Sequence, residues 1–194
     1  MCNQKGLCVT TVFLYPLAIT SIICSILLFF PGWSYEYFSQ GKLTTEVRLS
    51  GGLVGGLVVL IPAFFVQKAE KCLCCCKCCG PCLSVLLEAL GVVGAMYSFG
   101  VALSGLLNGP YCKGYWTWGT PFKGQGGSYL HDQSQWSTCS EPEDVVKFNV
   151  ILFSILLAIS SLKIIFCSSH IICILVSCLC LPPTALVAAK AASP

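Results

Sequence analysis

The stretch KCLCCCKCCGPC at residues 71–82 contains seven cysteines among twelve residues. Cysteine thiolates ligate zinc, form disulfides and accept acyl chains, so three kinds of chemistry compete here. Zinc sites use C-x₂-C pairs, a spacing that Cys72 and Cys75 have and that Cys79 and Cys82 have. Cys74–Cys76 are consecutive, however, which ordinary zinc motifs are not. The choice depends on the side of a membrane on which the stretch lies.

The composition indicates that a lipid bilayer must solvate much of the chain. Its 194 residues are 56% hydrophobic and only 10% charged, with a mean hydropathy of +0.81. Soluble domains carry about 25% charged residues, so too little polar surface exists to cover a soluble globule. The net charge is only +3 and the few lysines are scattered along the chain, which argues against a nucleic-acid binder.

Four apolar runs are long enough to span a membrane, since a helix needs about 20 residues to cross the hydrocarbon core. A signal peptide is the alternative for the first run, but its apolar core is too long and no A-x-A site follows. We therefore predict an all-α membrane protein with a four-transmembrane-helix bundle. The predicted segments are a cytosolic N-terminus at 1–6, transmembrane helices at 7–30, 49–66, 83–107 and 148–169, a short extracellular loop at 31–48, a cysteine-rich cytosolic loop at 67–82, a large extracellular loop at 108–147 and a cytosolic tail at 170–194.

The distribution of charges and cysteines predicts the orientation. The short loop 67–82 holds three lysines against one glutamate, which favours the cytosolic side. Cys112 and Cys139 are the only cysteines in the loops that then lie outside, where disulfides persist. We expect these two to form a disulfide that closes the second extracellular loop, while the inner thiols stay reduced.

On the cytosolic side, S-palmitoylation is the interpretation that we favour for the juxtamembrane cysteines. Each buried CH₂ of an acyl chain contributes about 0.8 kcal/mol to membrane attachment. A metal site and an unmodified loop remain the alternatives. The candidate residues are Cys72, Cys74, Cys75, Cys76, Cys78, Cys79 and Cys82, with Cys2, Cys8, Cys173, Cys178 and Cys180.

Two charged residues, Glu88 and Lys163, lie clearly within the predicted helices. Counted from the helix ends at 1.5 Å per residue, each lies about 8 Å from the inner face. A lone intramembrane charge is costly, so we predict that they form an ion pair. The alternative is that each side chain reaches the inner interface separately.

Small residues in the second predicted helix indicate close helix packing. Gly51, Gly52, Gly55 and Gly56 form two overlapping G-x-x-x-G registers, which let helix backbones approach closely in lipid. Packing inside the bundle is the first interpretation, and a face for homo- or hetero-oligomers is the second.

The large predicted outer loop is rich in aromatic residues. Tyr115, Trp116, Trp118 and Trp136 are candidates for a partner-binding patch, because tyrosine and tryptophan are frequent binding anchors. Some of these rings are equally expected in an interfacial belt or a small loop core.

An ordered set of motifs gives the chain a family resemblance. LLFFPGW, SGGLVGGLVVLIPAFF, CCKCCG, NGPYC, WGTPF, YLHDQSQWSTCSEP and FNVILFSILLAISSL follow one another along it. Together they resemble the transmembrane-four L-six antigen family of tetraspanin-like proteins. The resemblance implies a non-enzymatic protein of the plasma membrane or endolysosomal membranes, without cofactor. It would associate laterally with integrins, tetraspanins and receptors, or with a second copy of itself, and influence adhesion, migration, growth and signalling.

A different class of function is the alternative, a transport bundle or one that binds a small molecule or lipid in its interior. Transport requires polar groups that line a path through the membrane. No constellation typical of an enzyme is found.

Overall fold

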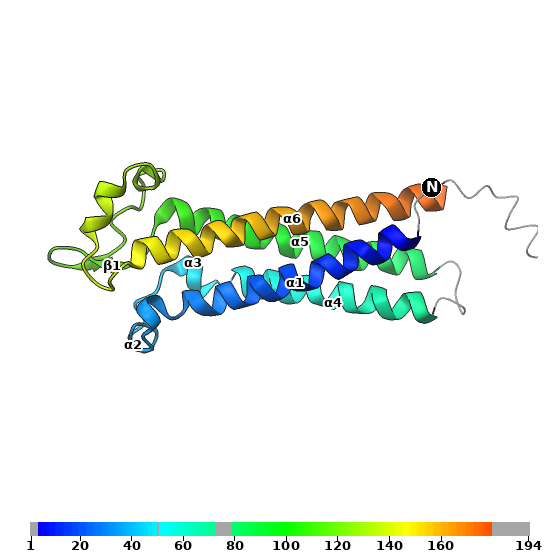
Figure 1. The fold of residues 1–194 in the computed structure, drawn as a ribbon, viewed down its shortest axis with the longest axis horizontal. Helices are drawn as coiled ribbons and strands as arrows, with labels where there is room; N and C mark the ends of the chain where they lie inside the picture. Colours follow the sequence, from blue (N-terminus) through cyan, green and yellow to red (C-terminus); the bar gives the residue numbers. More distant parts are fainter. Residues whose placement is uncertain (1–3, 50, 73–78, 180–194) are drawn as a thin grey trace, which may run out of the picture.

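The computed structural model describes residues 4–49, 51–72 and 79–179. Its long helices are α1 (Gln4–Leu28), α4 (Gly51–Cys72), α5 (Cys79–Asn108) and α6 (Val145–Leu179). They run alternately up and down and pack in the cyclic order α1–α4–α5–α6 (Figure 1). The start of α1 lies beside the end of α6, and we call this the tail end of the bundle. The opposite end, where the ordered loops lie, is the loop end.

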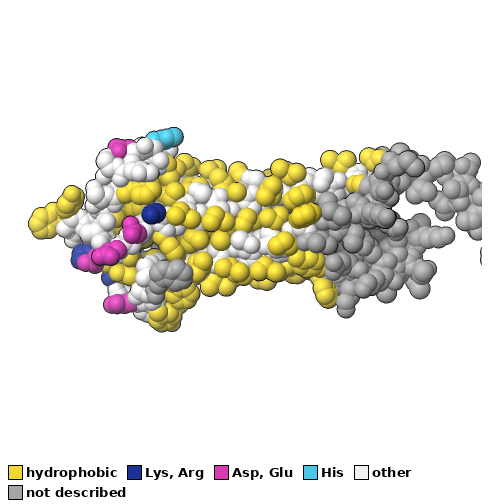
Figure 2. Space-filling model, viewed as in Figure 1, with side chains coloured by type: hydrophobic (Ala, Val, Ile, Leu, Met, Phe, Trp, Pro, Cys, Tyr) yellow, Lys and Arg dark blue, Asp and Glu magenta, His cyan; other side chains and the backbone are white. Residues whose placement is uncertain are grey.

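Large apolar side chains cover the outside of the helices (Figure 2). Leu86 and Val93 of α5 are 64% and 63% exposed, and Ile165 of α6 is 60% exposed. The charged side chains visible in this view gather at the loop end. Among the described residues, Ser84–Asn108 and Val145–Val176 are long and apolar enough to cross a membrane. That α1 and α4 also span it stays a prediction.

The helices extend beyond several of their predicted limits. The last helix was expected to end at residue 169, but α6 continues to Leu179 because the sequence after residue 169 stays apolar and contains neither glycine nor proline before that point. At the tail end, α4 runs to Cys72 and α5 begins at Cys79, so both enter the predicted loop 67–82. The loop end also contains a short β-hairpin, which the all-α prediction lacked.

The glycines of α4 divide between its two neighbours. A Cβ added to Gly55 would lie 2.5 Å from the carbonyl oxygen of Gly94 on α5, and Gly51 packs against Val101 of the same helix. Gly52 and Gly56 face α1 instead, where the added Cβ atoms would approach backbone carbonyl oxygens. Each G-x-x-x-G register therefore packs against one neighbouring helix within the chain.

Candidate functional site

A small folded unit of residues 109–144, which we call the outer module, covers the loop end. It contains the antiparallel pair β1 (Cys112–Lys113) and β2 (Trp118–Gly119), followed by the 3₁₀ helices η2 (Ser128–Leu130) and η3 (Gln133–Thr138). Cys112, Phe122 and Tyr129 form its core against Val145 and Val146 at the start of α6. The outer module thus has its own apolar core and also rests on the bundle.

A disulfide between Cys112 and Cys139 closes the outer module, as the sequence predicted. It joins β1 to the residue that follows η3. Lys113 adds two backbone hydrogen bonds beside it: its N–H donates to Glu141 O at 2.9 Å, and its carbonyl accepts from Ser140 N at 2.9 Å. The two ends of the outer module are therefore fixed to each other.

Tyr129 attaches the outer module to α5. Its hydroxyl donates to the carbonyl oxygen of Leu106 at 2.6 Å, and its ring stacks on Phe122 at a centroid distance of 4.4 Å. Burial raises the pKa of Tyr129 to about 12. The indole N–H of Trp136 donates to the carbonyl oxygen of Tyr129 at 2.8 Å. Trp136, predicted as a candidate for partner binding, therefore has a structural contact inside the outer module.

Trp118 is held by the first outer loop, which contains η1 (Pro31–Trp33), α2 (Glu36–Ser39) and α3 (Thr45–Arg48). The ammonium of Lys42 lies 3.9 Å from the centroid of a Trp118 ring, a cation–π contact. Tyr37 adds an aromatic contact at 6.0 Å. Asn108, the last residue of α5, donates to Glu46 Oε1 of α3 at 2.7 Å. These contacts join the two outer loops into one surface.

The turn between β1 and β2 presents two aromatic side chains to solvent. Gly114 N donates to Thr117 O at 3.0 Å and closes the turn. Tyr115 is 84% exposed and Trp116 is 94% exposed. The structure thus separates the four predicted aromatic candidates: Trp118 and Trp136 pack within the outer surface, whereas Tyr115 and Trp116 project from it. We call these two the aromatic tip.

Polar residues line the contact between α5 and α6, which we call the α5–α6 seam. Ser160 Oγ donates to Ser98 Oγ at 2.9 Å, and His170 Nδ1 lies 2.8 Å from Glu88 Oε1. Nearer the loop end the contact is apolar, since a Cβ on Gly105 would meet the ring of Phe153. Along these three contacts, taken from the loop end, the residue number on α5 falls by seven and then by ten, and the residue number on α6 rises by seven and then by ten. One antiparallel register therefore extends along the seam.

This register does not join Glu88 to Lys163 as predicted. It places Lys163 opposite Ala95, seven residues and about 10 Å along the axis from the level of Glu88. Glu88 contacts His170 instead, and within the described chain Lys163 Nζ has no hydrogen-bond partner. The prediction failed because it measured depth on each helix separately, whereas the packing of Phe153 on Gly105 sets the register between them. His170 lies seven residues after Lys163 on the same helix face, which is the signal that sequence reasoning missed.

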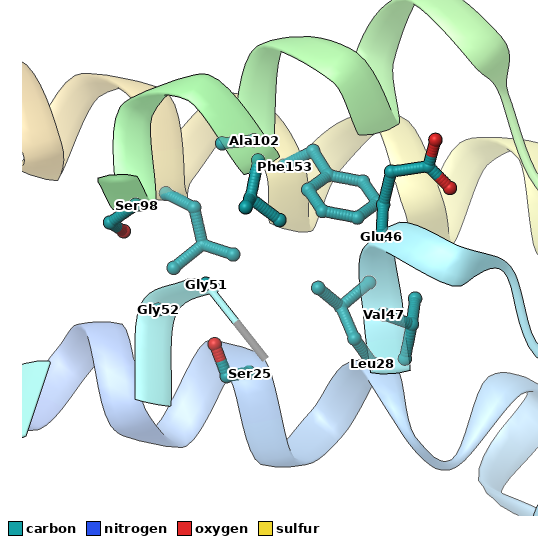
Figure 3. A pocket seen from close by; sticks show the side chains of 11 residues that line it. Ser25, Leu28, Glu46, Val47, Gly51, Gly52, Ser98, Ala102 and Phe153 are labelled. Carbon is teal, nitrogen blue, oxygen red and sulfur yellow. The ribbon is translucent and has the colours of Figure 1, made fainter. Parts of the chain in front are cut away.

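A small cavity lies among α1, α3, α4, α5 and α6 (Figure 3). Ser25, Glu46 and Ser98 line it together with apolar side chains such as Phe153. Its volume is about 10 Å³, about the least that holds one water. Within the described residues, no group of three or more His, Cys, Asp or Glu side chains could hold a metal ion.

The predicted acylation sites lie mostly beyond what the structure describes. Cys2, Cys74, Cys75, Cys76, Cys78 and Cys180 lie outside the described residues. Cys8, Cys72, Cys79, Cys82 and Cys178 lie in helices, but their side chains are not described. Cys173 is disulfide-bonded, so the prediction that it is a reduced thiol open to acylation is wrong in this structure. It lies on the part of α6 that was expected to be a tail.

Long antiparallel helices with apolar outer surfaces, joined to a disulfide-closed loop module, define a tetraspanin-like membrane protein. The chain belongs to the L6 membrane protein family, whose model matches residues 1–183.

Curated relatives match over most of their length. The chain is 38% identical to transmembrane 4 L6 family member 18 of Bos taurus over 188 residues, 92% of each chain. It is 39% identical to member 4 of Mus musculus over 181 residues, 86% of each chain. It is 36% identical to member 5 of Bos taurus over 186 residues, 93% of this chain and 94% of the relative. No solved structure matches it significantly.

Proposed function

We propose that this protein is a non-enzymatic membrane scaffold that associates laterally with other membrane proteins through its aromatic tip. Integrins, tetraspanins and receptors are the partner classes, and modulation of adhesion, migration, growth or signalling is the outcome. The observation that carries this proposal is the exposure of Tyr115 and Trp116, 84% and 94%, on a turn that no described residue covers. Its setting is the plasma membrane or endolysosomal membranes, with the tail end in the cytosol.

The physical argument is that the aromatic tip is both apolar and already ordered. Tryptophan and tyrosine supply a large contact area and are enriched among the residues that dominate binding energy. The Cys112–Cys139 disulfide and the backbone hydrogen bonds of Lys113 fix the hairpin that carries them. Because the hairpin is ordered before binding, a partner pays little entropy to fix it.

An interior site for a small molecule or a transported solute is the alternative function. The cavity among the helices has a volume of about 10 Å³, whereas ligand pockets are usually about 300–1,000 Å³. The polar α5–α6 seam offers hydrogen-bonding groups, but several of them already contact one another, Ser160 with Ser98 and His170 with Glu88. The exterior aromatic tip is therefore the better-supported site.

Proximity labelling in cells tests the proposal. We expect the double variant Tyr115→Ser/Trp116→Ser to lose its ectodomain neighbours, because truncation of an aromatic anchor weakens binding by at least about tenfold. Tyr35→Ser is the matched control, since Tyr35 is also an exposed aromatic residue (64%) but belongs to the first outer loop. Unchanged neighbours for a double variant that reaches the surface would contradict the aromatic tip as the binding site.

A further inference from the structure

One face of α6 is polar over three helical turns in the interior of the bundle. Ser160, Lys163, Cys167 and His170 follow each other at spacings of three or four residues, which places them on one face. They are 0%, 0%, 1% and 3% exposed. Toward the loop end, an apolar cluster that includes Phe153 and Leu156 closes this face. Such a buried polar row in an otherwise apolar helix requires hydrogen-bond partners.

Two atoms of this row lack such partners within the described chain, namely Lys163 Nζ and His170 Nε2. Ser160 bonds to Ser98, and His170 Nδ1 contacts Glu88, so the rest of each local network is satisfied. Buried polar groups in native proteins are nearly always paired with protein or ordered water. The two unpaired atoms therefore indicate a ligand that the described part of the chain does not supply.

The balance of charge decides what chemistry this ligand has. With Glu88 ionised and Lys163 protonated, the seam carries no net charge when His170 is neutral, and a net charge in the low-dielectric interior is costly. Neutral His170 donates from Nδ1 to Glu88 Oε1, which leaves Nε2 as an acceptor. Lys163 Nζ is a donor. In this charge state, the ligand must accept a hydrogen bond from Lys163 Nζ and donate one to His170 Nε2.

We propose that the α5–α6 seam binds water in the interior of the bundle, between Lys163 Nζ and His170 Nε2. Water both accepts and donates hydrogen bonds, whereas an anion only accepts. The residues of α5 opposite Lys163 and Cys167 are small, namely Ala95 and Gly91. A short chain of water molecules spans the distance between the lysine ammonium and the imidazole two turns further along α6.

Histidine-labelled protein provides a direct test, since the chain contains only two histidines. The full-length chain, labelled with ¹⁵N-histidine, is reconstituted in lipid bilayers and studied by water-edited solid-state NMR. The exposed His131 serves as the internal reference for contact with bulk water. We expect magnetisation from water to reach the His170 ring as well, and we expect the ring to be the neutral tautomer with hydrogen on Nδ1.

Two results in the unmodified protein would overturn the proposal. The first is a His170 ring that receives no water magnetisation while His131 does, which means that the seam is dry. The second is a His170 ring protonated on both nitrogens with a signal that follows chloride concentration, which means that the ligand is an anion.

Two variants locate the water. Lys163→Met should abolish transfer from water to His170, because water in an apolar site needs at least two polar partners. Ser160→Ala removes the Ser98 hydrogen bond from the same face but neither unpaired atom, so transfer should persist. Retained transfer in a folded Lys163→Met protein would show that the water does not lie between the two residues.

Discussion

At the scale of a single residue, Tyr129 couples the outer module to the bundle. Replacing Tyr129 by phenylalanine keeps the ring that stacks on Phe122 but removes the hydroxyl that bonds to the Leu106 carbonyl. An unpaired buried carbonyl costs about 1–3 kcal/mol, so the free energy of unfolding of the outer module should fall by about that amount. Tryptophan fluorescence during thermal unfolding measures this change. Tyr115→Phe, at an exposed ring, should have no effect.

The pH dependence of the same variant separates the hydroxyl from the ring. Below about pH 10, the phenol of Tyr129 is protonated in both the folded and the unfolded protein, so its contribution does not change. Between this pH and the folded pKa of about 12, only the unfolded state releases the proton, so stability falls as pH rises. Tyr129→Phe should remove this part of the alkaline destabilisation. Equal alkaline slopes for both proteins would show that Tyr129 is not the group responsible.

At the scale of the helices, two glycines test the packing of α4 on α5. Gly55→Ala would place a Cβ 2.5 Å from the backbone of Gly94, which cannot move aside as a side chain can. We expect a loss of about 1–3 kcal/mol in the free energy of unfolding, as for other overpacked sites. Thermal unfolding in detergent, followed by circular dichroism, measures it.

Gly100→Ala is the control for this prediction. No atom lies within 4 Å of the position of its added Cβ, so alanine should be neutral or stabilise α5 by up to about 1 kcal/mol. If both variants are equally stable, α4 and α5 are not packed as closely as the structure has them.

At the scale of the whole molecule, acylation near the tail end would decide how the bundle is distributed in the membrane. Serine replacement of the cysteines in residues 72–82 should lower partition into ordered membrane fractions and leave the helical bundle intact. Several acyl chains together anchor a segment strongly, which is the reason for this expectation. Acyl-exchange labelling of the purified protein is the measurement. Zinc bound at one atom per chain, without thioester-linked lipid, would favour the metal alternative instead.

Sequence alone determined the features that depend on composition and on local spacing. Apolar runs predicted the long helices because burying backbone in lipid requires helical hydrogen bonding. The Cys112–Cys139 disulfide was predictable because no other cysteine lies in the two outer loops. The overlapping glycine registers of α4 predicted close packing, although not that one register faces α1 and the other α5.

Tertiary structure decided what depends on how the elements meet. Sliding α6 along α5 by two turns would leave the hydropathy of both helices unchanged, so sequence could not select His170 over Lys163 as the partner of Glu88. The bulk of Phe153 against Gly105 selects it. Nor could composition distinguish Trp116 from Trp118, since both lie in one short aromatic stretch. Only the contacts of Trp118 with Lys42 and Tyr37, made across two loops, leave Trp116 as the exposed ring.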